Sequence, residues 1–277
     1  MSIFQSFILG LVQGVTEFLP ISSTAHLILV PWLLNWSFNE EAVFAFNVLV
    51  QLGTVTAVIL YFRRDLWKIA LAVLNGIRRG RPFVSDNARL GWLVVAATVP
   101  AAIIGLLFKR FFEALHHNPL LIASIVAGAA ALFLVERISR HDRDLSALTW
   151  RDAVIIGCSQ ALALLPGVSR SAATISGGLV LGLKRDAAAR FSFLMSIPIL
   201  IAASAIAVKD LIDLPNTMSY VPSLAVGFIA AAVVGYLSIH WLLGYLAKRS
   251  LYLFAWYRIA FGLLCFIAAF VRGQFSF

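Results

Sequence analysis

Six long apolar segments constrain what this chain can fold into more than any other feature of its sequence. Crossing a bilayer as a helix takes about 20 residues, and the segments cover residues 42–62, 90–108, 119–136, 187–208, 221–243 and 252–271. Hydrophobic residues make up 61% of the 277 residues and charged residues only 13%, about half the charged share of a soluble domain. We therefore predict an all-α polytopic membrane protein with six transmembrane helices.

Two further apolar stretches, at 3–34 and 153–183, are each interrupted near the middle by proline and hydroxyl residues. The interruptions read Pro20-Ile21-Ser22-Ser23-Thr24 and Pro166-Gly167-Val168-Ser169-Arg170-Ser171. Irregular backbone at membrane depth survives only where protein or a water-filled cavity satisfies its polar groups. We predict that both stretches are re-entrant helical hairpins, each of which enters and leaves the membrane on one side.

Basic residues are distributed unevenly across this predicted topology. With the N-terminus outside, sixteen of the 22 Lys and Arg residues fall on the inner side, as the positive-inside rule expects for cytoplasmic loops. Two more, Arg170 and Arg258, lie inside apolar segments. The net charge of +9 therefore indicates membrane orientation and not a nucleic-acid partner. The four basic residues on the outer side are Lys109, Arg110, Lys209 and Arg272.

The two halves of the chain resemble each other. Each half reads as one hairpin followed by three spans, and an odd number of spans turns the second half upside down relative to the first. We predict one membrane domain, residues 1–277, with repeat one at about 1–145 and repeat two at about 146–277, whose hairpin tips meet near the midplane. The matching residues are Gly10, Gln13, Pro20 and Ser23 in the first half and Gly157, Gln160, Pro166 and Ser169 in the second.

The first hairpin carries polar residues that are costly in a membrane. A charged side chain in a span costs about 2.5–3.5 kcal/mol on insertion scales, so it marks function by default. Gln13 and Glu17 are four residues apart and share one face of a helix, and His26 follows the hairpin tip. A carboxylate, hydroxyl groups and an imidazole this close can hold a metal ion, a nucleophile and an acid or base. The hydroxyls of Ser22 and Thr24 could equally cap the second helical arm.

The second hairpin has the features of an anion site. A glycine-bearing turn that leads into a helix presents backbone N–H groups to an anion, and Ser169, Ser171 and Thr174 add hydroxyl donors. Arg170 supplies a planar, permanently charged group suited to phosphate oxygens. The alternative is that Arg170 simply pairs with Glu17, and both interpretations bring the hairpin tips together.

A positive site facing one carboxylate and one histidine inside a bilayer indicates a lipid with a phosphorylated head group. Only Glu17 is embedded, so a two-metal centre would lack ligands. A single Mg²⁺ or Ca²⁺ between Glu17 and diphosphate oxygens suits these hard oxygen donors. Arg258, which follows Trp256 and Tyr257, is expected to extend its side chain to the inner membrane interface.

At these residues the chain resembles the bacterial undecaprenyl-diphosphatase family, also called the bacitracin-resistance protein family, over essentially its whole length. The resemblance implies an inner-membrane hydrolase that converts undecaprenyl diphosphate to undecaprenyl phosphate, recycles this lipid carrier for peptidoglycan synthesis, cell-wall biogenesis and cell shape, and confers bacitracin resistance. The motifs are Gln13-Gly-Val-Thr-Glu17-Phe-Leu-Pro20-Ile-Ser-Ser23-Thr-Ala-His26 and Pro166-Gly-Val-Ser-Arg170-Ser-Ala-Ala-Thr174-Ile-Ser-Gly-Gly178.

The resemblance also implies roles for single residues. The family's glutamate-rich motif falls on Gln13 and Glu17, its essential histidine on His26, its serine on Ser23 and its phosphate-binding arginine on Arg170. Glutamine is a permitted variant at the first of these positions, so this hairpin offers one carboxylate. The nucleophile is then Ser23 activated by His26, or His26 itself, or a water molecule that His26 polarises. The sequence does not choose among these, and we favour Ser23 and His26 acting together.

The predicted site combines both hairpins: the first supplies the groups for catalysis, and the second binds the diphosphate. A lipid flippase or transporter on the same inverted-repeat scaffold is the alternative. The expected partners are undecaprenyl diphosphate and membrane lipids, without nucleic acid and with a homodimer left open, and the outward-opening first hairpin suggests a site on the periplasmic face. The predicted catalytic residues are Glu17, Ser23, His26 and Arg170, the substrate-binding residues are Gln13, Ser22, Thr24, Ser169, Ser171 and Thr174, and the metal ligand is Glu17.

Overall fold

The chain folds into a bundle of helices, seen in a computed structural model that describes residues 1–108, 111, 120–212 and 221–273. The regular structure of these residues is helical, apart from an isolated bridge between Arg143 and Leu183. The predicted all-α polytopic architecture is therefore confirmed. The elements are α1 (Ile3–Thr16), α2 (Ser23–Leu33), α3 (Glu40–Arg78), α4 (Asp86–Leu107), α6 (Leu120–Ile138), the 3₁₀ turn η1 (Leu145–Ala147), α7 (Trp150–Leu162), α8 (Arg170–Val180), α9 (Arg185–Ile212), α10 (Val221–Leu246) and α11 (Tyr252–Arg272).

Six helices in the described part of the chain are long and apolar enough to cross a membrane, and they match the six predicted segments: α3, α4, α6, α9, α10 and α11. Helix α3 has 39 residues, about 58 Å at 1.5 Å per residue, roughly twice the thickness of the hydrocarbon core. Arg63 and Arg64 end the apolar segment of α3 but not the helix. Residue 119, where the third predicted span begins, and Lys109 and Arg110 lie outside the described residues.

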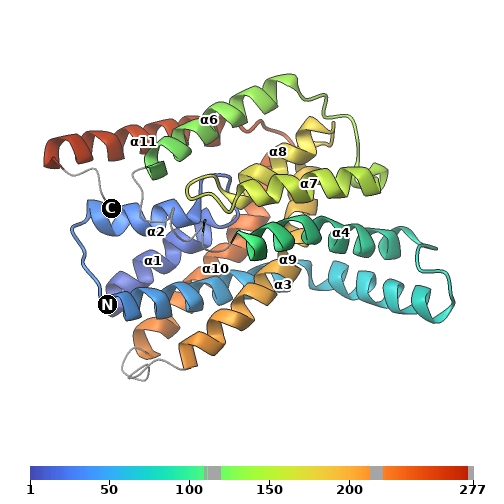
Figure 1. Cartoon of the computed structure of the whole chain (residues 1–277), viewed down its shortest axis with the longest axis horizontal. Helices are drawn as coiled ribbons and strands as arrows, with labels where there is room; N and C mark the ends of the chain where they lie inside the picture. The colour runs from blue at the N-terminus through green and yellow to red at the C-terminus, as the bar shows by residue number, and fades with distance from the viewer. Residues whose placement is uncertain (109–110, 112–119, 213–220, 274–277) are drawn as a thin grey trace.

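Each interrupted stretch is a pair of helices joined by a short non-helical segment. The first tip, residues 17–22, joins α1 to α2, and the second tip, residues 163–169, joins α7 to α8. In Figure 1 the α1–α2 hairpin extends from the end of the molecule where the N-terminus lies, whereas the α7–α8 hairpin extends from the opposite side, and both point to the middle. Their re-entry into a bilayer, and which side faces the cytoplasm, stay predictions.

The two tips end in the same backbone conformation. Ser22 and Ser169 have φ angles of 75° and 76°, in the left-handed region that is uncommon for residues other than glycine. Each serine is the N-cap of the helix that follows, and its side chain accepts a hydrogen bond from the backbone N–H of Ala25 or Ala172. The second helical arms therefore begin alike in both hairpins, and Ser22 does act as a cap.

The first arms also pack alike. A Cβ atom on Gly10 of α1 would lie 2.6 Å from the carbonyl oxygen of Gly227 in α10, and one on Gly157 of α7 would lie 2.4 Å from that of Ala97 in α4. Both positions therefore need glycine so that two helix backbones can approach closely. These paired features support the predicted repeat, and its division at about residue 145 stays a prediction.

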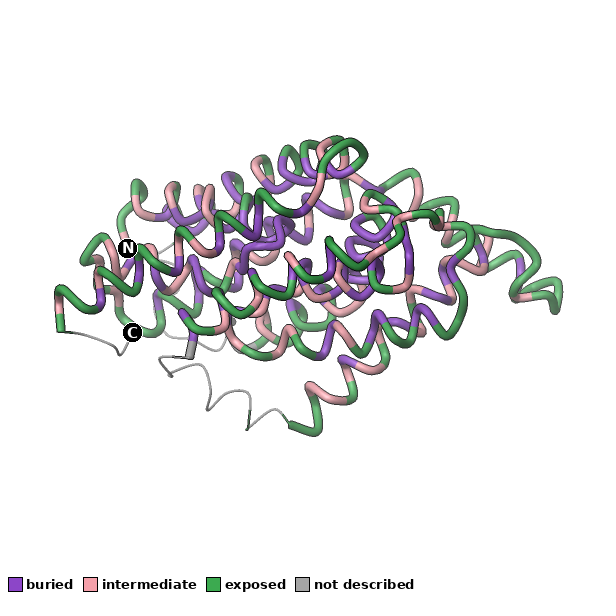
Figure 2. Tube along the Cα trace, turned by 90° about the horizontal axis from the view of Figure 1, so that it is seen from above, coloured by how far each residue is buried: buried purple, intermediate pink, exposed green. Residues whose placement is uncertain are grey.

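Buried positions are concentrated in the middle of the bundle, and exposed positions lie mostly on its outward-facing turns (Figure 2). Phe18 of the first tip packs edge-on against Phe193 of α9, with ring centroids 5.4 Å apart. Large apolar residues such as Leu106 and Phe270 are 76% and 70% exposed. Exposed apolar surface on this scale fits a molecule whose surroundings are lipid.

Candidate active site

The two tips of the hairpins are in direct contact. Arg170 Nη2, in the first turn of α8, donates to Glu17 Oε1 of the first tip at 3.2 Å. Ser171 Oγ donates to the backbone carbonyl oxygen of Leu19 at 2.9 Å. Residues 153 positions apart in the chain thus form an ion pair, and the prediction that the tips meet is confirmed.

Glu17 is the centre of the polar cluster at this contact, and its side chain is only 7% exposed. Its Oε2 accepts from Ser23 Oγ at 2.8 Å and from Gln13 Nε2 at 3.2 Å. Its Oε1 accepts from Gln51 Nε2 at 3.5 Å, besides Arg170. Four donors from four helices therefore hold one carboxylate, which explains how a charged group is accommodated at this depth.

A cavity of about 150 Å³ opens beside this cluster, between the two tips. Arg170 Nη1 is buried and has no hydrogen-bond partner in the described part of the chain. Because Nη2 of the same guanidinium already holds Glu17, Nη1 is the nitrogen that remains without a partner beside the cavity that Arg170 lines, and a guanidinium N–H is a strong donor to an anion. The predicted site residues that line the cavity are Glu17, Ser22, Ser23, Thr24, Ser169 and Arg170, and Gln51, Leu165 and Gly167 line it as well.

Besides His26, three predicted site residues do not line this cavity. Ser171 is fully buried, and its hydroxyl donates to the backbone carbonyl oxygen of Leu19. Thr174 Oγ1 is within 2.6 Å of Ser192 Oγ and donates to the carbonyl oxygen of Arg170. The Ser171 hydroxyl therefore links α8 to the first tip, and the Thr174 hydroxyl stabilises the first turn of α8. The third residue is Gln13, which reaches the site through Glu17.

Neither nitrogen of the His26 imidazole has Ser23 Oγ as its hydrogen-bond partner. His26 Nδ1 is 2.7 Å from the carbonyl oxygen of Ser22, and Nε2 is 2.8 Å from Tyr257 Oη. A carbonyl only accepts, so Nδ1 carries the proton, and Nε2 accepts from the tyrosine hydroxyl. The imidazole also stacks on Phe261, with centroids 4.2 Å apart. Ser23 has Glu17 as its partner, so the favoured Ser23–His26 pair is absent from this arrangement.

A divalent cation would find limited support from this chain. No group of three or more His, Cys, Asp or Glu residues gathers in the described residues. The oxygen donors of the cluster include the Glu17 carboxylate, which lines the cavity, and Gln13 Oε1, a buried acceptor without a partner in the described part of the chain. This set fits one hard cation that draws its remaining ligands from diphosphate oxygens and water, as Mg²⁺ usually does, and it does not fit an all-protein metal cage.

Sequence reasoning missed Gln51 of α3 and Tyr257 of α11, and it was wrong about Arg258. Gln51 is an amide in the middle of an apolar segment, and the rule that embedded polar residues mark function could have identified it. Arg258 does not reach the membrane interface, because its side chain is completely buried. Its neighbours Trp256 and Tyr257 indicated an interface, but the fold turns Arg258 inward.

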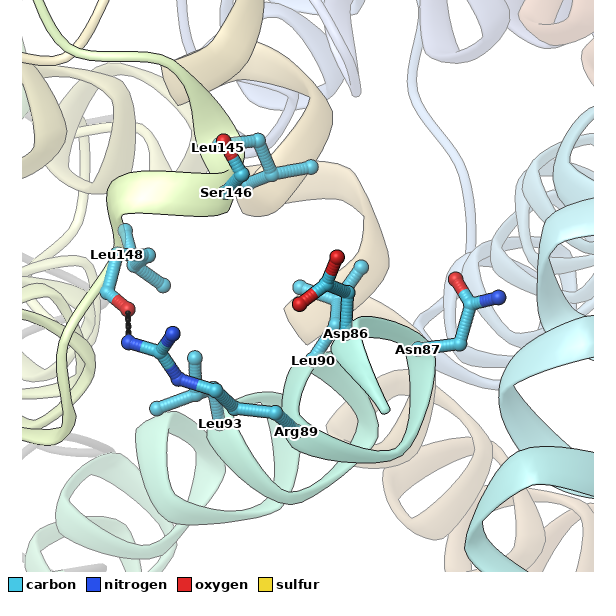
Figure 3. A pocket seen from close by; sticks show the side chains of 8 residues that line it. All are labelled: Asp86, Asn87, Arg89, Leu90, Leu93, Leu145, Ser146 and Leu148. Atoms are coloured by element: carbon cyan, nitrogen blue, oxygen red, sulfur yellow. Dashed lines mark hydrogen bonds between the residues drawn. The ribbon is translucent and has the colours of Figure 1, made fainter. Parts of the chain in front are cut away.

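Other cavities in the described part of the chain lie outside this cluster. An apolar groove of about 470 Å³ shares no lining residue with the polar cavity, and His26, Trp241 and Tyr257 are among the residues that line it. A third, of about 170 Å³, lies between the first turn of α4 and residues 145–148, where Arg89 donates to the carbonyl oxygen of Leu148 (Figure 3). This third cavity contains no predicted site residue, and the apolar groove contains only His26. The polar cavity between the tips, which six predicted site residues line, is therefore the candidate active site.

Comparisons with known proteins agree on one family. The family model described as bacitracin resistance protein BacA matches residues 6–264. An undecaprenyl-diphosphatase of Anaeromyxobacter dehalogenans strain 2CP-1 is 44% identical over 263 residues, which cover 95% of this chain and 90% of that protein. The one of Myxococcus xanthus DK1622 is 43% identical over 268 residues (96% and 89%), and the one of Chlorobium phaeobacteroides BS1 is 44% identical over 271 residues (95% and 95%).

Proposed function

The chain belongs to the bacitracin resistance protein BacA family, and on that premise we propose how it works as an undecaprenyl-diphosphatase, the membrane hydrolase that converts undecaprenyl diphosphate to undecaprenyl phosphate. One observation carries the mechanism: Arg170 holds Glu17 with one nitrogen and leaves the other free at a cavity that Ser23 also lines. An anion-binding group and a hydroxyl bonded to a carboxylate thus face the same space.

Arg170 binds the terminal phosphate of the lipid in this cavity. A guanidinium offers paired N–H groups that match phosphate oxygens. The N-cap Ser169 lies next to it at the start of α8, where the helix dipole favours an anion. When the Arg170 guanidinium transfers its hydrogen bond from Glu17 to the phosphate, the Glu17 carboxylate becomes free to accept the proton of the Ser23 hydroxyl.

Ser23 is the nucleophile in this proposal, and Glu17 is the base. Ser23 Oγ attacks the terminal phosphorus while its proton passes to Glu17 Oε2, 2.8 Å away. The bond from that phosphorus to the bridging oxygen breaks, Glu17 passes the proton to this oxygen, and undecaprenyl phosphate leaves. Water then attacks the phosphoserine and gives a proton to Glu17. Glu17 returns this proton to Ser23 Oγ as the bond from phosphorus to Oγ breaks, which releases inorganic phosphate and restores Ser23.

His26 positions Ser23 in the arrangement seen here. Its Nδ1–H group holds the carbonyl oxygen of Ser22, the residue before Ser23, and Tyr257 fixes the imidazole from the other side. A direct role of His26 as acid, base or nucleophile requires the ring to give up one of these hydrogen bonds, and it stays a prediction.

We propose that a single divalent cation, Mg²⁺ or Ca²⁺, assists the reaction. Glu17 and the unpartnered Gln13 Oε1 are the residues that would hold it. Such an ion supplies charge neutralisation for diphosphate oxygens. We also propose that the protein lies in the bacterial inner membrane with the first hairpin open to the periplasm, supported by the excess of basic residues predicted on the opposite side.

Phosphate release from undecaprenyl diphosphate by the purified protein in detergent tests this function. Arg170→Ala should lower kcat/KM by about 100-fold or more, because a charged donor at the developing negative charge is lost. Arg190→Ala is the matched control, since Arg190 pairs with Asp65 at 2.8 Å outside the site, and it should hydrolyse at the parental rate. Lipid movement in vesicles without phosphate release would favour the flippase alternative.

A further inference from the structure

Arg258 of α11 uses every N–H group of its buried guanidinium on a backbone carbonyl. An arginine side chain has five N–H donors, and five hydrogen bonds to five different carbonyl oxygens are present. Nε donates to Ile125 at 2.9 Å, Nη1 to Pro20 at 3.3 Å and to Val168 at 3.1 Å, and Nη2 to Ser124 at 3.2 Å and to Gly167 at 2.9 Å.

These five carbonyl groups come from three separate segments. Pro20 belongs to the first tip, Gly167 and Val168 belong to the second tip, and the other two belong to α6. Carbonyl groups in turns at membrane depth need a donor from the protein, because no water reaches them. One side chain on α11 therefore joins the two tips that carry Glu17 and Arg170.

Gly128 of α6 makes room for this side chain. A Cβ atom at this position would lie 2.0 Å from Arg258 Nη2 and 2.5 Å from Cζ, which is too close for any side chain. Gly128 does not line the polar cavity. Its substitution therefore displaces the guanidinium while leaving every residue of the cavity and every donor of Arg258 in the chain.

The charge of Arg258 has no carboxylate opposite it within the described ranges, where its hydrogen bonds all go to carbonyl oxygens. Gly167, one of its partners, also lines the polar cavity, so the charge lies one peptide group behind the cavity wall. In surroundings of low polarity such a charge acts over a longer range than in water. It therefore adds to the positive potential that attracts an anion.

We propose that Arg258 is a positioning residue for the phosphatase reaction. It holds the two tips at the relative position in which Arg170 pairs with Glu17, the hydrogen-bond partner of Ser23. Its charge also favours diphosphate binding in the cavity. The inference rests on the proposed function, since it concerns the alignment of that same site. Lysine cannot replace it, because an ammonium has three donors and no planar fork.

Steady-state hydrolysis of undecaprenyl diphosphate by three variants tests the role of Arg258. Arg258→Lys keeps the charge and loses at least two of the five hydrogen bonds, and it should lower kcat/KM by about 100-fold, as misplacement of reacting groups by about 1 Å can do. Gly128→Ala displaces the same guanidinium and should also lower kcat/KM, with a lower kcat and a higher KM. Gly244→Ala is the matched control, because its Cβ would meet nothing within 4 Å, and it should keep parental kcat and KM.

A double-mutant comparison separates positioning from general stability. If Arg258 acts by aligning Arg170 with Glu17, Arg258→Lys should cost less than about threefold in an Arg170→Ala background, whereas independent effects would multiply. Equal losses in both backgrounds, or parental kinetics in folded Arg258→Lys or Gly128→Ala, would overturn the inference.

Two further outcomes, variants that fail to fold and a parent protein without activity, lead to different conclusions. If Arg258→Lys cannot be purified folded, the comparison is made with Gly128→Ala. Failure of both to fold, while Gly244→Ala folds, would assign Arg258 to folding alone and would also overturn its positioning role. A parent protein that releases no phosphate would instead overturn the proposed function.

Discussion

Replacing Glu17 by glutamine tests the polar cluster most sharply, because the substitution keeps the shape and removes the charge. The carboxylate accepts from Ser23 and Gln13 on Oε2 and from Arg170 and Gln51 on Oε1. An amide turns one of these oxygens into an NH₂ group, which then faces two donors. The hydroxyl of Ser23 can rotate to accept, so we expect the NH₂ group on the Oε2 side, where Ser23 loses its base.

The hydrogen bonds of Glu17 set the expected loss of stability and the expected loss of catalytic rate. A hydrogen bond to a charged group contributes about 1.5–3 kcal/mol, but the Arg170 side chain is 15% exposed and can turn toward the cavity. We therefore expect a loss of only about 1–3 kcal/mol in the free energy of unfolding. Loss of a general base typically costs about 100-fold to 10,000-fold in rate, so kcat should fall far more than stability does.

Glu136→Gln is the matched control for this prediction. Glu136 is 5% exposed and bonds Arg185 and the backbone N–H of Leu251, so it is a second buried Glu–Arg pair. It lies eleven residues along α6 from Ile125, about 16 Å at the rise of an α-helix. Phosphate release and thermal unfolding in detergent are measured for both variants. The reasoning is refuted if folded Glu17→Gln keeps the parental kcat, or if Glu136→Gln loses as much activity.

Three further substitutions make separate predictions. Tyr257→Phe leaves His26 Nε2 without its donor and should lower the free energy of unfolding by about 1–3 kcal/mol, and an unchanged unfolding temperature would contradict a stabilising role for this hydrogen bond. Gly157→Ala should force α7 away from α4 at a cost of about 1–3 kcal/mol, whereas Gly105→Ala, whose Cβ meets only Leu164 side-chain atoms at 3.7 Å, should be close to neutral. Gln13→Glu adds a second carboxylate beside Glu17 and should lower the Mg²⁺ concentration for half-maximal hydrolysis by about tenfold, and an unchanged Mg²⁺ dependence would argue against a cation at Gln13 and Glu17.

The six spans and both hairpins could be predicted from the sequence because the lipid requirement leaves few solutions. Apolar length fixes the spans, and a proline with hydroxyl groups at the middle of an apolar stretch fixes the tips. The meeting of the two tips followed from the inverted repeat, and the pairing of Arg170 with Glu17 is the alternative that the sequence left open. These predictions depend on local pattern and on symmetry, which a sequence contains.

The errors concern residues whose surroundings are set by tertiary packing. Arg258 lies beside Trp256 and Tyr257 in the chain, yet the rotation of α11 turns it toward the tips and Gly128 provides the space. Ser23 and His26 are three residues apart, but the imidazole is bound by Tyr257, 231 residues away. The partner that Ser23 does have, Glu17, lies across the tip in the first hairpin arm.

The central claim is that both hairpin tips form one diphosphate site, and protection from alkylation measures it most directly. Thr24 and Leu165 line the cavity from the first and second hairpins, so Thr24→Cys and Leu165→Cys report on the two sides. The exposed native Cys158, outside the cavity, is the internal control in each variant. A non-hydrolysable undecaprenyl diphosphate analogue should protect both new thiols over the same concentration range and leave Cys158 reactive. Protection of only one of the two thiols would contradict a shared site.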